Sequence, residues 1–143
     1  MSRTTNIPAS YLVLIQNEKI LLLQRKNTGY RDGDYSLIAG HAEEGESFSQ
    51  ALLREAREEA GIILDPADIQ TVHIMHRNSD DSVRLDAFFT SSRWKGEIQN
   101  REPDKCSDLS WFPLEDLPKN TIPYIKEALD HIQKGVFYSE YGW

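Results

Sequence analysis

Short apolar blocks alternate with polar turns along the first part of the chain and predict strands. Residues 10–15 and 20–23 are the first two apolar runs, and the polar residues 16–19 separate them. Continuous apolar runs of this length are typical of strands that are buried on both faces. The pattern therefore predicts an N-terminal hairpin in which at least one strand is covered on both sides.

The rest of the chain mixes strand and helix patterns. A turn-rich loop at residues 28–34 follows the hairpin, and residues 122–134 have the spacing of an amphipathic helix. Further strand-like runs lie at 35–39, 69–76, 83–90 and 109–113. Because strands and helices interleave, we expect an α/β fold with a mixed sheet packed between helices. No repeat or linker interrupts the pattern, so residues 1–143 are predicted to form a single domain.

Residues 47–60 predict a helix whose acidic side chains lie on an unexpected face. The segment lacks Gly and Pro, starts at the N-cap candidate Ser47 and ends at Gly61. At about 100° per residue, its glutamates fall on the arc that Phe48, Ala51 and Leu52 mark as facing the protein. These glutamates are Glu55, Glu58 and Glu59. Like charges three or four residues apart repel one another, so we expect a divalent cation to balance them.

Composition and charge narrow the possible partners. The net charge of −7 disfavours a protein that mainly holds nucleic acid, because phosphate backbones attract a basic face. No apolar run approaches the roughly 18 residues that span a bilayer, and the N-terminus lacks the apolar region of a secretory signal. The single cysteine, Cys106, can form no internal disulfide. These features favour a cytoplasmic protein with no membrane partner.

A 23-residue segment, 40–62, resembles the Nudix box. That signature consists of Gly, five residues, Glu, seven residues and then R-E-U-x-E-E-x-G-U, in which U is aliphatic or small and apolar. Here the fixed positions are filled by Gly40, Glu46, Arg54, Glu55, Glu58, Glu59 and Gly61. On these residues the chain is similar to the Nudix hydrolases, and more closely to the MutT-like pyrophosphohydrolases.

The resemblance implies a Nudix fold, which is an α/β/α sandwich around a mixed β-sheet, and metal-dependent hydrolysis of a phosphoanhydride bond. It also implies ligands for Mg²⁺ or Mn²⁺, cations that prefer hard oxygen donors. The implied ligands are the Gly40 carbonyl and the side chains of Glu55, Glu58, Glu59 and a later loop glutamate, best aligned with Glu102 and alternatively with Glu97. Glu55 or Glu102 is the expected general base. Ala39 departs from the family, since many relatives have a second glycine there.

Three further side chains each have two interpretations. Arg54 orients the catalytic carboxylates through hydrogen bonds that include Glu46, or it only forms a surface ion pair with Glu58. Arg25 matches an arginine that contacts substrate phosphates in similar enzymes, or it ends an edge strand in water. Asn120 falls near a base-reading asparagine of the family, or it is an ordinary turn residue.

The segment 100–118 resembles the corresponding stretch of Nudix enzymes that hydrolyse nucleoside triphosphates, including oxidised or modified ones. This favours a nucleoside triphosphate pyrophosphohydrolase that releases a monophosphate and pyrophosphate. A hydrolase of another nucleoside diphosphate derivative, such as a nucleotide sugar, is the alternative, as is a non-catalytic nucleotide sensor. A factor that processes capped RNA is disfavoured, because no basic stripe with interleaved aromatics is present. The sequence does not decide between a monomer and a homodimer.

Overall fold

The computed structural model describes residues 3–143, and its central feature is a five-stranded mixed sheet. The strand order is β5 (Ile38–His41), β1 (Asn6–Val13), β7 (Val83–Ser91), β6 (Ile69–Asn78) and β9 (Tyr138–Tyr141). β1 runs parallel to β7 and β6 parallel to β9, whereas the other two pairs are antiparallel. The prediction of an α/β fold with a mixed sheet is confirmed.

A four-stranded antiparallel sheet lies beside the first one. It contains β2 (Ile15–Gln16), β3 (Lys19–Arg25), β4 (Tyr35–Ser36) and β8 (Cys106–Pro113). The predicted hairpin therefore exists as β2–β3, but the apolar run of residues 10–15 is divided between the two sheets. The same division corrects the single strand predicted at 35–39. Ser36 pairs with β3 and Ile38 pairs with β1, so the chain changes sheet at the buried Leu37.

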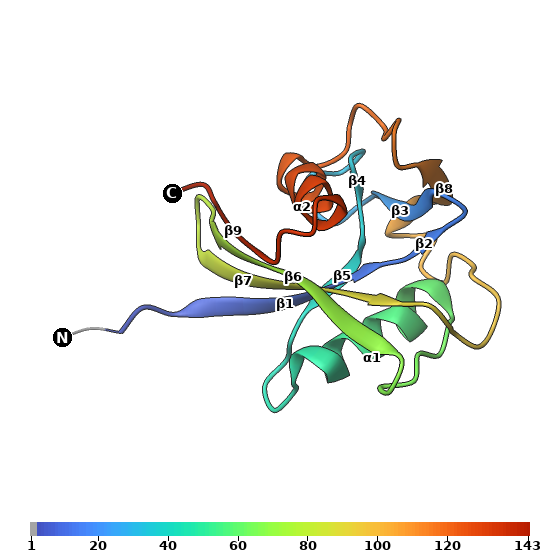
Figure 1. Cartoon of the computed structure of the whole chain (residues 1–143), viewed down its shortest axis with the longest axis horizontal. Coiled ribbons are helices and arrows are strands. Elements are labelled where there is room, and N and C mark those ends of the chain that lie inside the picture. Colours follow the sequence, from blue (N-terminus) through green and yellow to red (C-terminus); the bar gives the residue numbers. More distant parts are fainter. Residues whose placement is uncertain (1–2) are drawn as a thin grey trace.

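Two helices in the described residues cover opposite faces of the five-stranded sheet (Figure 1). Helix α1 (Phe48–Ala60) packs with the apolar cluster that contains Leu12, Ala87 and Phe89, and helix α2 (Pro123–Gln133) packs with the cluster that contains Tyr11, Val13 and Phe88. Successive residues of β1 and β7 thus alternate between the two cores. This arrangement confirms that apolar runs without polar alternation are strands buried on both faces.

The ends of α1 agree with the sequence prediction. The Ser47 hydroxyl accepts a hydrogen bond from the Gln50 amide, and the Gln50 side chain accepts one from the Ser47 amide, which forms a capping box. Gly61 ends the helix in the left-handed conformation, with φ of 71°. Both ends of the helix that carries the acidic residues are therefore fixed by local hydrogen bonds.

The C-terminal segment forms a strand that the sequence pattern did not predict. β9 pairs in parallel with β6, from Ile74 opposite Tyr138 to Arg77 opposite Tyr141. The Trp143 indole donates a hydrogen bond to the His76 carbonyl at 2.9 Å and lies against the His76 ring. The aromatic tail consequently completes the edge of the sheet. In the described part of the chain, no helix is long and apolar enough to cross a membrane.

Candidate active site

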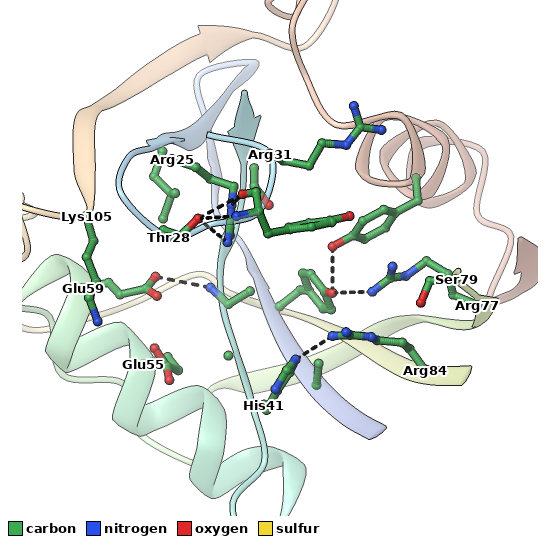
Figure 2. Close-up of a pocket in the computed structure, with 18 of the residues that line it drawn as sticks. Arg25, Thr28, Arg31, His41, Glu55, Glu59, Arg77, Ser79, Arg84 and Lys105 are labelled. Atoms are coloured by element: carbon green, nitrogen blue, oxygen red, sulfur yellow. Dashed lines mark hydrogen bonds between the residues drawn. The ribbon is translucent and has the colours of Figure 1, made fainter. Parts of the chain in front are cut away.

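A pocket of about 1330 Å³ lies where α1, β5, the loop after β3 and the β6–β7 hairpin approach one another. Figure 2 shows Glu55 and Glu59 of α1 at one end of this pocket and Arg77 and Arg84 of the hairpin at the other. His41, at the end of β5, lies between them and is linked to Arg84 by a hydrogen bond of 2.7 Å. The pocket is therefore acidic on the helix side and rich in arginine on the hairpin side.

The Nudix-box glycine, Gly40, is in direct contact with a glutamate of α1. A Cβ atom at position 40 would collide with the carboxylate of Glu55. Any larger residue at position 40 would therefore require the Glu55 side chain to move away from the β5 backbone. The Glu55 side chain is only 13% exposed. Strand β5 and helix α1 thus present a backbone segment and a carboxylate to the same end of the pocket.

Glu59 lies one turn further along α1 and is partly buried. Its Oε2 accepts a hydrogen bond of 3.3 Å from the Ala39 amide. Burial raises the pKa of Glu59 well above its usual value, and the negative charge of Glu55 raises it further. Burial also raises the pKa of Glu55, although its hydrogen bonds oppose the shift. Two partly desolvated carboxyl groups thus share one small volume, which favours a cation between them.

Glu58 differs from its two neighbours. Its side chain is 49% exposed, so the expectation that all three glutamates face the protein is wrong for Glu58. On the wheel Glu58 lies at the edge of the protein-facing arc, on the side toward Arg54 and Arg57. Glu58 nevertheless lines the pocket.

Arg54 connects the acidic residues of the helix to the preceding loop. Its Nε and NH2 atoms donate to the two oxygens of Glu46 at 2.7 and 3.0 Å, which is a bidentate pair. Its NH1 atom donates to Glu55 at 2.7 Å and to Glu58 at 3.3 Å, and NH2 also reaches the His41 carbonyl. The guanidinium lowers the pKa of Glu46 to about 2. These contacts favour an orienting role over a simple surface ion pair with Glu58.

Of the remaining predicted residues, some line the pocket and others lie outside it. Glu102 lines the pocket and lies near enough to Glu59 for its charge to raise the pKa of Glu59. Glu97, the alternative, is exposed and outside the lining. Arg25 lines the pocket at the end of β3. Asn120 is outside the lining, and its side chain instead donates to the Gly33 carbonyl at 2.6 Å.

Comparison with known sequences identifies the family of the chain that forms this pocket. The family model described as "NUDIX domain" matches residues 6–132, which include both helix α1 and the Gly40 strand. The chain belongs to the Nudix family.

Two curated relatives match most of this chain but less than half of their own length. The NAD-capped RNA hydrolase NudC of Pseudomonas entomophila is 38% identical over 112 residues, which are 78% of this chain and 38% of that protein. The NudC of Stutzerimonas stutzeri is 33% identical over 109 residues, which are 76% of this chain and 37% of that protein. The chain thus matches well under half the length of these relatives.

Solved Nudix structures share the fold. The MutT Nudix hydrolase of Burkholderia pseudomallei superposes with a TM-score of 0.80 at 24% identity, covering 88% of this chain and 97% of that one. The MutT protein of Methanosarcina mazei Go1 gives a TM-score of 0.79 at 17% identity, covering 94% and 97%. At these identities the likeness concerns the fold alone, and it confirms the Nudix fold expected from the box.

The carboxylate oxygens of the Nudix helix are suited to a hard divalent cation, but three of these side chains do not point toward one common position. Within residues 3–143, no group of three or more His, Cys, Asp or Glu side chains is arranged so that it could hold a metal ion. The hydrogen bonds explain this. Arg54 holds Glu55 and Glu58 toward itself, whereas Glu59 is turned to the Ala39 amide. Glu55 and Glu59 nevertheless lie close together, because each affects the pKa of the other, so two of the candidate ligands already share one volume.

Sequence reasoning missed a buried ion pair at the other end of the pocket. Arg77 Nε donates to Asp86 Oδ2 at 2.7 Å, and their side chains are 5% and 0% exposed. The Arg77 guanidinium also lies 3.7 Å from the centre of the Tyr124 ring. The register of the β6–β7 hairpin was the signal from which this pair could have been predicted. Since Arg77 pairs with Arg84, Asp86 is two residues further on the same face.

Proposed function

We propose that this chain is a metal-dependent Nudix pyrophosphohydrolase that cleaves a phosphoanhydride bond in a nucleoside diphosphate derivative. The observation that supports this most strongly is the packing of Glu55 against Gly40, with the partly buried Glu59 beside it, in a pocket large enough for a nucleotide. A structural helix gains nothing from partly desolvated, mutually repelling carboxylates. The arrangement is useful when a cation and an anionic substrate occupy the pocket.

The proposed chemistry assigns separate tasks to the residues of the chain. Glu55, Glu58, Glu59, Glu102 and the Gly40 carbonyl would hold Mg²⁺ or Mn²⁺. When bound, such a cation neutralises phosphate charge and lowers the pKa of coordinated water. Glu55 or Glu102 accepts the proton of the attacking water on a carboxylate oxygen. Arg54 keeps Glu55 and Glu58 oriented, and Arg25, whose Nε and NH2 atoms bond to the loop after β3, would contact the substrate at the pocket wall.

The first substrate candidate is a nucleoside triphosphate, ordinary or modified. The resemblance of residues 100–118 to triphosphate-hydrolysing relatives supports it. The expected products are a nucleoside monophosphate and pyrophosphate, because water would attack between the α and β phosphates.

The second candidate is a dinucleotide pyrophosphate such as NAD, free or at the end of RNA. The NudC relatives are named for NAD-capped RNA, and the pocket volume of about 1330 Å³ exceeds the range typical of small-ligand sites. Because the chain matches only 37–38% of those proteins, their substrate is a hypothesis here. The acidic composition still favours a small nucleotide over a long nucleic acid.

A substrate panel tests both candidates in one experiment. Nucleoside triphosphates, NAD, a nucleotide sugar and a short NAD-capped RNA are incubated with the protein and Mg²⁺, and the products are resolved by chromatography. Monophosphate plus pyrophosphate from a triphosphate supports the first candidate, and two monophosphates from NAD support the second. Nucleoside diphosphate plus orthophosphate as the main products would contradict the proposed position of attack. Binding of nucleotides without turnover of any would instead favour a sensor.

We further propose that residues 1–143 act as one domain in the cytoplasm. The family match over residues 6–132 supports a single folding unit, and the two sheets share their apolar clusters.

A further inference from the structure

The loop between β3 and β4 presents an exposed aromatic ring to the pocket. Tyr30 lines the pocket and is 48% exposed, whereas Tyr11 and Tyr124 in the same lining are 4% and 8% exposed. The hydroxyl groups of Tyr11 and Tyr124 are also hydrogen-bonded to each other. Tyr30 therefore offers an open aromatic surface, and such a surface at a pocket wall is suited to a flat ligand.

Hydrogen bonds within the loop hold this ring in place. Asp32 accepts bonds from the Thr28 amide at 3.0 Å, the Thr28 hydroxyl at 2.6 Å and the Gly29 amide at 3.0 Å. Asn27 and Arg31 adopt left-handed conformations, with φ of 53° and 52°. Asparagine adopts that conformation readily, but it is unfavourable for arginine, so the contacts around Arg31 stabilise it. The loop is consequently preorganised in the absence of ligand.

Two side chains from outside the loop fix it to the body of the protein. The Gly33 carbonyl accepts one hydrogen bond from the Gln24 amide group at 2.9 Å and another from Asn120 at 2.6 Å. Gln24 belongs to β3, and Asn120 lies shortly before α2. The loop that carries Tyr30 is thus tied both to the strand directly before it and to a distant segment of the chain. A rigid presenting loop reduces the entropy lost when a ligand binds.

Arg25 makes the two faces of the Tyr30 ring different. Its guanidinium carbon lies 5.3 Å from the ring centre, and its Nε donates to the Tyr30 carbonyl at 2.7 Å. One face is therefore covered by a cation, which leaves the other available for stacking. Figure 2 shows Arg25, Thr28 and Arg31 along the side of the pocket between Glu59 and Arg77. A nucleotide whose phosphates lie at the acidic end could place its base along this side.

We propose that Tyr30 is the stacking platform for the substrate's nucleobase, and that Arg25 behind the ring makes the platform selective for a neutral base over a positively charged one. Every base has a π face that can stack on an aromatic side chain. A fixed positive charge close behind the ring repels a second positive charge in front of it. The inference rests on the proposed function, since it assigns Tyr30 to the substrate of that reaction.

Binding of adenosine monophosphate tests the platform without turnover, because this nucleotide has no phosphoanhydride bond. In proton NMR with Mg²⁺, the base protons should move upfield on binding to the wild-type protein. Tyr30→Leu should remove this shift and weaken binding about tenfold, whereas Tyr30→Phe should retain both. The loop should persist in these variants, since Arg25 and Thr28 bond to the Tyr30 backbone. Tyr138→Leu is the matched control, because Tyr138 is 50% exposed and outside the pocket lining.

The charge preference needs a second ligand. 1-Methyladenosine monophosphate carries a positive base of nearly the same shape, and the wild-type protein should bind it several-fold more weakly than adenosine monophosphate. Arg25→Gln should reduce that difference. Equal binding of adenosine monophosphate by Tyr30→Leu and wild type, or equal binding of the two nucleotides by wild type, would overturn the corresponding part of the inference. Failure of hydrolysis in the substrate panel, with these binding results intact, would instead refute only the proposed function.

Discussion

The two ends of the pocket handle buried charge in opposite ways. On the hairpin side Arg77 and Asp86 form a pair of equal and opposite charges, almost completely removed from solvent. On the helix side Arg54 pairs with Glu55 and Glu58 and is already shared with Glu46, whereas Glu59 bonds to the Ala39 amide. A balanced pair completes a fold, because each charge offsets the burial of the other. An unbalanced cluster is stable only when it is partly open to water or to an added cation.

The pair at the hairpin still has one unmet requirement. Within the described residues, Asp86 Oδ1 is buried without a hydrogen-bond partner. Burial raises the pKa of Asp86, and the bond from Arg77 lowers it. Asp86 therefore depends strongly on Arg77. The comparison leads us to expect that changes at the acidic cluster affect activity, whereas changes at the buried pair affect stability.

Removal of divalent cations should have the largest effect. With excess EDTA, hydrolysis of the best substrate from the panel should fall to background, because without a cation the negatively charged carboxylates repel the phosphates and no metal activates the water. Addition of Mg²⁺ or Mn²⁺ in excess over the chelator should restore it. Full turnover in EDTA would refute the metal mechanism.

Glu58→Gln should separate activity from stability at the acidic cluster. If Glu58 is a metal ligand, kcat should fall on the order of a thousandfold, or about 4 kcal/mol of transition-state stabilisation. Because Glu58 is half exposed and bonds to Arg54 only at 3.3 Å, metal-free unfolding free energy should change by no more than about 0.5 kcal/mol. Glu44→Gln is the control, since Glu44 is an exposed loop carboxylate outside the pocket lining. Equal kcat values in the two variants would mean that Glu58 is a solvent-exposed side chain that does not bind the metal.

Arg77→Met should mainly lower the free energy of unfolding, in contrast to Glu58→Gln, which should mainly lower kcat. It leaves the Asp86 charge buried without its partner, so urea unfolding should show a loss of about 3–5 kcal/mol. The double variant Arg77→Met with Asp86→Leu should recover most of that loss, because no lone charge remains. A single variant as stable as wild type would show that the pair contributes little to the fold.

The smallest effect is expected at the N-terminus of the Nudix helix. Ser47→Ala removes the hydroxyl that accepts the Gln50 amide, and unfolding free energy should decrease by about 1 kcal/mol. Ser49→Ala, within the same helix, should be neutral or slightly stabilising, because Ala has the higher helix propensity. If the two substitutions had the same effect, the capping box would not be what fixes this end of the helix.

Local rules were sufficient for the Nudix helix and for the β6–β7 hairpin. Ser47 and Gly61 mark the helix ends through hydrogen bonds within a few residues, and the short polar segment before Val83 separates two clear strand patterns. The metal-ligand candidates also followed from the box, since spacing along one helix fixes which side chains share a face. Glu58 was misjudged because burial at the edge of a face depends on what packs there.

Other features depended on contacts between distant segments, which a periodic pattern does not encode. The change of sheet at Leu37 and the added strand β9 depend on which strands pair with them. The Gly33 carbonyl accepts a hydrogen bond from the distant Asn120, which helps to fix the Tyr30 loop at the pocket wall. The sequence by itself determined the helix, its carboxylates and the family. Tertiary structure alone decided which carboxylates are buried, which arginine is paired and which ring faces the pocket, because desolvation and charge pairing depend on the complete three-dimensional surroundings of each side chain.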